Sequence, residues 1–276
     1  VRADRGSDGL SRPWVIAHRG SSFEYAEHTL AAYERAVADG ADALECDVRL
    51  TADGHLVCVH DRRIDRTSTG RGVVSTKTLD DLRAFDFGSW KQTWDDFEEP
   101  PVVDEARSRV LTLDRLLELV TSAGRPVGLA IETKHPTRYA GLVEERTVEL
   151  LRRFGLARPR SEQDSRIRIM SFSQLSARRV RALAPGLPTV FLMERVPLRF
   201  RDGTLPFGAR IAGPSIEIVR QYPRYVQRLH DAGAAVHVWT VDDLTDVDVC
   251  VRAGVDAVIT NRPRAVLEHL GRTAGA

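Results

Sequence analysis

Residues 43–60 read ALECDVRLTADGHLVCVH, and the length and turn chemistry of this stretch decide the fold. Two apolar runs, 43–50 and 55–60, are joined only by Thr51-Ala52-Asp53-Gly54. Parallel neighbours in a sheet need a crossover of about a dozen residues, whereas a short connection with Asp-Gly at the turn is typical of an antiparallel hairpin. We therefore expect the second run to fold back on the first as a return strand.

Apolar runs of strand length alternate with helical patterns along most of the chain, which indicates βα units and a parallel sheet. Apart from the return strand, candidate strands lie at 14–18, 43–50, 127–133, 167–172, 189–193, 209–213, 235–240 and 256–260. Candidate helices lie at 29–39, 113–123, 140–154, 175–184, 222–232, 244–253 and 262–270, and no helix is expected between 193 and 209. Because eight parallel strands close a barrel, the pattern predicts an α/β protein with a (β/α)8 TIM barrel.

The remaining segments are assigned around this barrel. We predict a loose N-terminal leader at 1–13 and a single barrel domain at 14–276, with an inserted segment at about 61–112 after the second strand's hairpin. The insertion is rich in Thr, Ser, Gly and Asp and predicts one short helix near 78–86. Long insertions with little regular structure are often lids or binding loops. A disordered surface excursion is the alternative.

Composition argues against several classes of protein. Lys plus Arg total 40 and Asp plus Glu total 39, so the net charge of +1 lacks the basic excess typical of nucleic-acid binders. Three cysteines do not suggest a disulfide framework. No apolar run approaches the roughly 18 residues of a membrane-spanning helix, and the polar N-terminus lacks the apolar core of a signal peptide. We expect a cytoplasmic protein with no nucleic-acid partner and no stable membrane insertion.

Arginine is concentrated in two local runs. Such runs fit a solvated face, and a contact surface for anionic head groups or phosphates is the alternative. The two runs are Arg178-Arg179-x-Arg181 and Arg195-x-x-x-Arg199-x-Arg201.

Acidic side chains lie within predicted strands, toward the carboxyl ends where barrel enzymes place their sites. Since side chains alternate along a strand, Glu45 and Asp47 share one face and Cys46 points the other way. On the next barrel strand, Glu132 is expected to point to the same inner face, with Ile131 on the opposite face. Like charges near 4 Å cost roughly 4 kcal/mol per pair at a dielectric of about 20, so either some carboxyls stay protonated or a cation lies among them. Oxygen ligands favour Mg²⁺ or Ca²⁺ over zinc.

Histidines and basic residues converge on the same predicted mouth. The hairpin brings His60, followed by Asp61, back beside the acidic pair, and His18 ends the neighbouring strand. Histidines suit proton transfer near neutral pH, a metal would polarise phosphoryl oxygens, and Arg19 and Lys134 suit a phosphate. Each residue alone has a simpler structural explanation, and only their convergence suggests a site. His237 is expected deeper in the barrel core, and surface or capping positions are expected for His28, His135, His230 and His269.

Taken in order, these motifs resemble the glycerophosphodiester phosphodiesterase family over about residues 14–262. The motifs are His18-Arg19-Gly20, Glu27-x-Thr29, Glu45-x-Asp47, His60-Asp61, Glu132-x-Lys134 and Trp239. The resemblance implies a (β/α)8 barrel with an insertion after the His-Asp motif. It implies hydrolysis of small-molecule glycerophosphodiesters to glycerol 3-phosphate and an alcohol, with one divalent cation, Ca²⁺ or Mg²⁺. One departure is Ala26-Glu27-His28-Thr29, where the family commonly has Pro-Glu-Asn-Thr.

The resemblance also implies a role for each matching residue. His18 and His60 match the acid/base pair, and Arg19 and Lys134 match phosphate contacts. Trp239 matches a residue beside the glycerol moiety. The divalent-metal ligands are matched by Glu45, Asp47 and Glu132.

Several alternatives stay open at this point. One is a phospholipase D-like enzyme acting on lysophospholipids or sphingolipids. Another is a barrel that binds a phosphoryl ligand without turning it over. The attacking group is either water or the substrate's own glycerol hydroxyl, through a cyclic phosphate. The sequence does not say which histidine is the acid.

Overall fold

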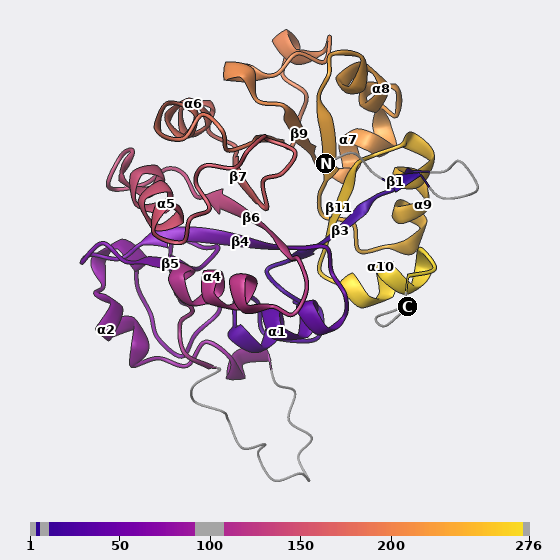
Figure 1. Cartoon of the computed structure of the whole chain (residues 1–276). Helices are drawn as coiled ribbons and strands as arrows, with labels where there is room; N and C mark the ends of the chain where they lie inside the picture. The colour runs from indigo at the N-terminus through magenta and orange to yellow at the C-terminus, as the bar shows by residue number, and fades with distance from the viewer. Residues whose placement is uncertain (1–3, 6–10, 92–107, 273–276) are drawn as a thin grey trace, which may run out of the picture.

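Eight parallel strands close into a barrel in the computed structural model, which describes residues 4–5, 11–91 and 108–272 (Figure 1). The first barrel strand, β3, pairs with β4 on one side and with β11 on the other, which completes the ring. The fold predicted from the sequence is therefore confirmed. The barrel strands are β3 (Trp14–His18), β4 (Ala43–Leu50), β6 (Gly128–Thr133), β7 (Ile167–Ser171), β8 (Thr189–Met193), β9 (Ile211–Pro214), β10 (Ala235–Val238) and β11 (Ala257–Thr260).

The return strand, β5 (Leu56–Cys58), runs antiparallel to β4 as predicted. Its register places Cys58 opposite Val48, and the backbone amide of Thr51 closes the turn by donating to the carbonyl of His55. Beyond β5, the amide of Val59 donates to the carbonyl of Asp47. The hairpin thus returns the chain to the acidic segment of β4.

Helices cover the outside of the barrel (Figure 1). Helix α1 begins where the Thr29 side chain accepts a hydrogen bond from the amide of Ala32, an N-cap that fixes the end of the preceding loop. The segment between β8 and β9 holds only two single 3-10 turns, as expected. The six-residue α7 was not predicted, because it is shorter than a clear helical period requires. The helices are α1 (Leu30–Ala38), α4 (Leu113–Ser122), α5 (Leu142–Arg153), α6 (Gln174–Leu183), α7 (Ile216–Gln221), α8 (Arg224–Asp231), α9 (Leu244–Ala253) and α10 (Pro263–His269).

The insertion is ordered over its described residues. It contains η1 (Val74–Thr76), α2 (Leu79–Arg83) and η2 (Ser89–Lys91), and a capping box between Thr78 and Asp81 starts α2. An apolar cluster joins it to the hairpin: Val57, Val59, Ile64, Val74, Leu79, Leu82, Phe87 and Val110. This part is therefore a packed subdomain. Residues 92–107 of the predicted insertion lie outside the described residues.

Within the predicted leader, β1 (Asp4–Arg5) and β2 (Ser11–Arg12) pair in an antiparallel arrangement. Residues 1–3 and 6–10 of the leader lie outside the described part of the chain. None of the helices described for this chain is long and apolar enough to cross a bilayer.

The alternation along β4 sorts its side chains between two apolar layers. Leu44, Cys46 and Val48 are buried in the outer layer against the helices, whereas Ala43 joins the apolar inner layer of the barrel. Cys46 faces away from the acidic residues, as predicted. Past Ala43, the next side chains that β4 directs inward are the acids Glu45 and Asp47.

Candidate active site

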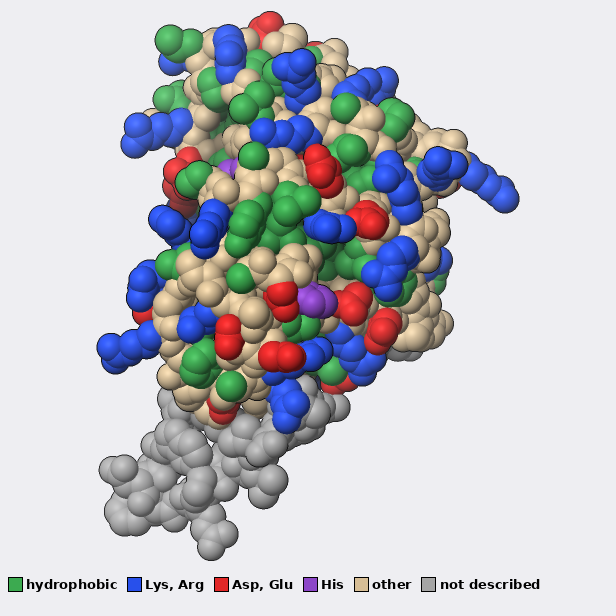
Figure 2. Space-filling model, turned by 90° about the vertical axis from the view of Figure 1, so that its left-hand side faces the viewer, with side chains coloured by type: hydrophobic (Ala, Val, Ile, Leu, Met, Phe, Trp, Pro, Cys, Tyr) green, Lys and Arg blue, Asp and Glu red, His purple; other side chains and the backbone are tan. Residues whose placement is uncertain are grey.

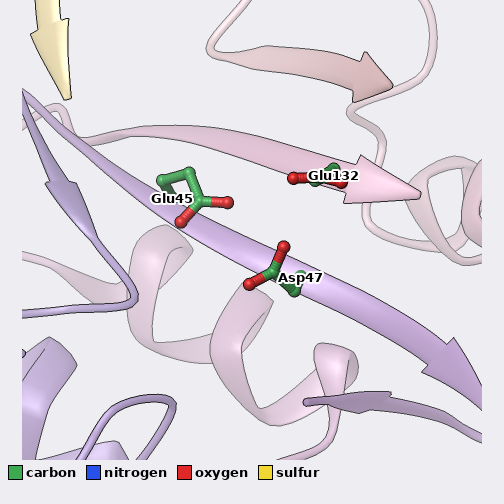
Figure 3. Close-up of side chains that lie close together, drawn as sticks. All are labelled: Glu45, Asp47 and Glu132. Atoms are coloured by element: carbon green, nitrogen blue, oxygen red, sulfur yellow. The ribbon is translucent and has the colours of Figure 1, made fainter. Parts of the chain in front are cut away.

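Three acidic side chains meet at the carboxyl ends of two adjacent strands. Glu45 and Asp47 project from β4 and Glu132 from β6, and all three point into one space (Figure 3). Asp47 and Glu132 are register partners, and one oxygen from each of the three carboxyls lies within 4.8 Å of the others. All three side chains are buried. The juxtaposition predicted from the sequence is therefore confirmed.

Burial and mutual repulsion make these carboxyls differ in acidity. Burial, followed by the charge of Asp47, raises the pKa of Glu45 well above its ordinary value. The same two causes raise the pKa of Glu132 to about 8. Burial alone would also raise the pKa of Asp47. The hydrogen bond from His28, followed by the charges of Arg19 and Lys134, instead holds that pKa well below its ordinary value. Asp47 is thus the permanent anion of the cluster.

Three cationic or proton-donating groups surround Asp47. Arg19 Nε and His28 Nε2 each lie 3.0 Å from Asp47 Oδ2. Lys134 Nζ lies 3.3 Å from Asp47 Oδ1 and 2.8 Å from Glu132 Oε1. Arg19 and Lys134, the two predicted phosphate contacts, are therefore both at the site, where their positive charges offset the negative charge of the acids.

His18, at the end of β3, has a fixed orientation and tautomer. Its Nδ1 lies 2.7 Å from Asn261 Oδ1, and Asn261 Nδ2 donates to Asp242 Oδ2 at 2.6 Å. Because a carboxylate only accepts, the amide of Asn261 must present its oxygen to His18, so Nδ1 of His18 is the donor. Nε2 is left unprotonated, 3.9 Å from Glu45 Oε2. Burial, followed by the charge of Arg19, lowers the pKa of His18 to about 3, so the ring is neutral.

His60 follows β5 and is held differently. Its Nδ1 lies 2.7 Å from Asp61 Oδ1, and Arg49 donates to its backbone carbonyl through Nε and Nη2. Burial lowers the pKa of His60, whereas the hydrogen bond with Asp61 acts in the opposite direction. The ring is about one-third exposed and keeps Nε2 available.

A chain of ion pairs connects Arg19, at the acidic cluster, with Asp61, which binds His60. Arg19 Nη1 donates to Glu27 Oε1, and Arg66 of the insertion donates to both oxygens of Glu27. Arg66 Nε also donates to Asp61 Oδ2, on the far side of the carboxylate that binds His60. The described part of the insertion therefore positions the acid that orients His60.

Aromatic side chains border the site from other strands. Trp239 follows β10 directly, and its indole N–H donates to the carbonyl of Gly213 at 2.7 Å. Its ring makes an edge contact with Phe172, which follows β7, at 5.4 Å between centroids. Trp239 thus lies at the mouth, and its contact with the glycerol moiety stays a prediction.

Comparison with known proteins identifies the family. The model of the "Glycerophosphoryl diester phosphodiesterase family" matches residues 18–265. The chain belongs to this family. A Mycobacterium tuberculosis protein named "Probable glycerophosphodiester phosphodiesterase 1" is 47% identical over 266 residues, covering 95% of each chain. A Bacillus subtilis glycerophosphodiester phosphodiesterase is 34% identical, covering 90% of this chain and 83% of the relative. The chain is accordingly a phosphodiesterase.

A solved structure extends the likeness to a product complex. An Oleispira antarctica phosphodiesterase in complex with "the product sn-glycerol-3-phosphate" superposes with a TM-score of 0.76 at 26% identity. The match covers 94% of this chain and 97% of the other. The barrel of this phosphodiesterase is therefore the fold of its family.

The acidic cluster of this phosphodiesterase fits a hard divalent cation. One oxygen of each of the three carboxyls lies within 4.8 Å of the others, and Asp47 Oδ1 is buried with Lys134 Nζ at 3.3 Å as its ionic partner. The donors are carboxylate oxygens, and Cys46, the nearest thiol in sequence, is buried in the outer layer. Oxygen donors of this kind select Ca²⁺ or Mg²⁺.

Sequence reasoning missed three residues of the site. The surface or capping position expected for His28 is wrong: it is 6% exposed, and its ring contacts Asp47 and the hydroxyl of Tyr33. A backbone φ of 60° at His28 turns the ring inward just before the α1 cap. Asn261 and Asp242 were also missed. Both follow barrel strands, so inspection of the residues at the carboxyl end of each strand, which identified Trp239, could have found them.

Proposed function

We propose that this phosphodiesterase hydrolyses glycerophosphodiesters to glycerol 3-phosphate and an alcohol, with one divalent cation held by Glu45, Asp47 and Glu132. The observation that carries the proposal is the meeting of these three acids beside two oriented histidines: His18 Nε2 lies 3.9 Å from Glu45 Oε2, and, although burial lowers the pKa of His60, the charge of Asp47 acts to raise it. The product bound to the Oleispira antarctica relative supports the choice of substrate. When bound, the cation would supply positive charge that polarises a non-bridging phosphoryl oxygen.

The chain's own cations bind the phosphate. Arg19 and Lys134 both lie at the acidic cluster, and each carries more N–H donors than its contacts with the acids use. An arriving phosphodiester is therefore met by fixed positive charge on two sides of the cluster. Trp239 and Phe172 offer an apolar surface to the carbon face of the glycerol unit.

The histidines divide the proton transfers. His18 is neutral with Nε2 unprotonated, so we assign it the base that takes a proton from the attacking hydroxyl. Asp61 stabilises the protonated ring of His60, so we assign His60 the acid that protonates the departing alkoxide. Nε2 is the reacting atom of each ring, because Nδ1 is occupied by Asn261 or Asp61.

Replacing Asp61 with asparagine tests this division. The carboxylate raises the pKa of His60, so removing its charge lowers that pKa. If His60 must be protonated, the alkaline limb of the kcat/KM profile moves to lower pH and activity at neutral pH falls. The measurement is the pH profile with glycerophosphocholine. Movement of the acid limb alone would show that His60 is the base.

Chelation tests the function itself. Treatment with chelator should abolish release of glycerol 3-phosphate from glycerophosphocholine, and adding back Ca²⁺ or Mg²⁺ separately should restore it and identify the working cation. Lysophosphatidylcholine is the second substrate, because the phospholipase D-like alternative predicts faster turnover of the lipid. Undiminished glycerol 3-phosphate release in chelator would contradict the metal assignment. The cytoplasmic location expected from the sequence stays a prediction.

A further inference from the structure

A cavity of about 310 Å³, which we name the side pocket, adjoins the candidate active site. Its walls come from the end of β4, from the insertion and from the loop between β6 and α5. The hydroxyl of Tyr139, in that loop, donates to the carbonyl of Ser75 of the insertion at 2.8 Å, which joins two of the walls. Lys134 also lines the pocket, and its Nζ contacts Asp47 and Glu132. The side pocket therefore lies next to the acidic cluster.

Four basic side chains line the side pocket, and among the described residues no acidic side chain does. The four are Arg49, Arg62, Lys134 and Arg138. Arg49 follows Asp47 two positions along β4, and its Nε and Nη2 donate to the backbone carbonyl of His60. In the part of the chain that the structure describes, none of the three arginines forms an ion pair. The lining is thus cationic, and it contacts the backbone of a proposed catalytic residue.

Neighbouring acids do not cancel this charge. Asp61 and Asp65, which lie on either side of Arg62 in the sequence, already pair with Arg66 and Arg63. Figure 2 shows the side of the molecule that carries α2 and α5, where Lys and Arg side chains are mixed with acidic ones over the surface. The surface of this side therefore has no single sign of charge, whereas the lining of the side pocket does.

The electrostatics of Arg49 show that the pocket lacks negative charge. Burial lowers the pKa of Arg49, and the charges of Asp47, Glu132 and Asp61 act to raise it, whereas that of Arg62 lowers it further. Because the lowering effects prevail, the surrounding acids do not fully compensate the guanidinium for its loss of water. An anion within a few ångströms would favour the charged form of the arginine. The chemistry of the lining therefore calls for an anionic group on the ligand.

We propose that the side pocket binds the leaving alcohol of the diester and selects alcohols that carry a second phosphate. The proposal rests on the glycerophosphodiester hydrolysis proposed above. His60 is the acid assigned to the departing alkoxide, and Arg49 holds its backbone, so the alcohol departs on the side of the pocket. Phosphate oxygens accept several N–H groups of arginine at once. A choline head group would instead bring a cation to a lining that offers it no acid.

Two inositol substrates test this selectivity. Glycerophosphoinositol and glycerophosphoinositol 4-phosphate differ by one phosphate on the leaving alcohol, and release of glycerol 3-phosphate is measured for each. The parent should hydrolyse the phosphorylated diester with a kcat/KM at least about tenfold higher, as expected for charge-assisted hydrogen bonds. Glycerophosphocholine should have the lowest kcat/KM of the three. In Arg62→Gln/Arg138→Gln, the ratio between the two inositol substrates should fall close to one.

Arg63→Gln is the matched control. Arg63 is exposed, pairs with Asp65 and does not line the side pocket, although it follows Arg62 directly. The same ratio should therefore keep its parent value in this variant. The proposal is overturned if the parent does not prefer the phosphorylated diester, if Arg62→Gln/Arg138→Gln keeps the preference, or if Arg63→Gln loses it to the same extent. In each of these cases glycerol 3-phosphate is still released, whereas no release from any of the three diesters would overturn the proposed function itself.

Discussion

Replacing His60 with alanine is expected to lower kcat by roughly a thousandfold, the usual contribution of a positioned general acid. His60 is the residue that keeps Nε2 free while Asp61 stabilises its protonated ring. Among the described residues, its ring forms no hydrogen bond or ion pair with the three acids, so the affinity for the divalent cation should stay close to that of the parent. The measurement pairs steady-state turnover of glycerophosphocholine with calorimetric titration of Ca²⁺ or Mg²⁺.

His55→Ala provides the control on the same hairpin. His55 sits at the turn, is well exposed, and its ring lies 3.8 Å from Asp53. The same substitution there should leave kcat unchanged. Parent-rate hydrolysis by His60→Ala would refute the assignment. A loss of cation affinity equal to the loss of activity would make His60 a structural residue of the metal site.

The sequence was sufficient to predict the barrel and the acidic cluster because both depend on local pattern. Four residues between two apolar runs leave room only for a hairpin, and period-two alternation places Glu45 and Asp47 on one face. The rule that strand ends converge then brings Glu132 beside them. These inferences need no knowledge of how distant loops fold.

The inward turn of His28 and the contact of Asn261 with His18 could not be predicted in this way. The inward turn of His28 depends on a positive backbone φ, which the pattern of apolar and polar residues does not predict. The contact between His18 and Asn261 spans 243 positions and joins the first barrel strand to the last, so it exists only once the ring has closed. Local periodicity therefore locates the reacting groups, whereas the groups that orient them come from closure of the fold.

Two of the proposed metal ligands, Asp47 and Glu132, are expected to have opposite effects on stability when no cation is bound. The folded-state pKa of Asp47 is depressed, so its ionised form stabilises the protein above its ordinary pKa of about 3.9, and this stability is lost as the pH falls. Asp47→Asn at pH 7 removes one counter-charge from each of three groups, Arg19, His28 and Lys134. We expect the free energy of unfolding to fall by about 3 kcal/mol.

Glu132→Gln should instead raise the free energy of unfolding when no cation is bound. With a folded pKa of about 8, Glu132 must take up a proton on folding at pH 7, so it lowers stability at all pH values above its unfolded pKa of about 4.3. A neutral amide removes this penalty, and we expect a gain of about 1 to 3 kcal/mol in chelator. Thermal unfolding in chelator, then with Ca²⁺ or Mg²⁺, measures both effects. The cation should raise the Tm of the parent far more than that of either variant, because each lacks one ligand. A loss of stability in chelator for Glu132→Gln, similar to that of Asp47→Asn, would show that the acids stabilise the fold without a cation, and the electrostatic case for a metal centre would fail.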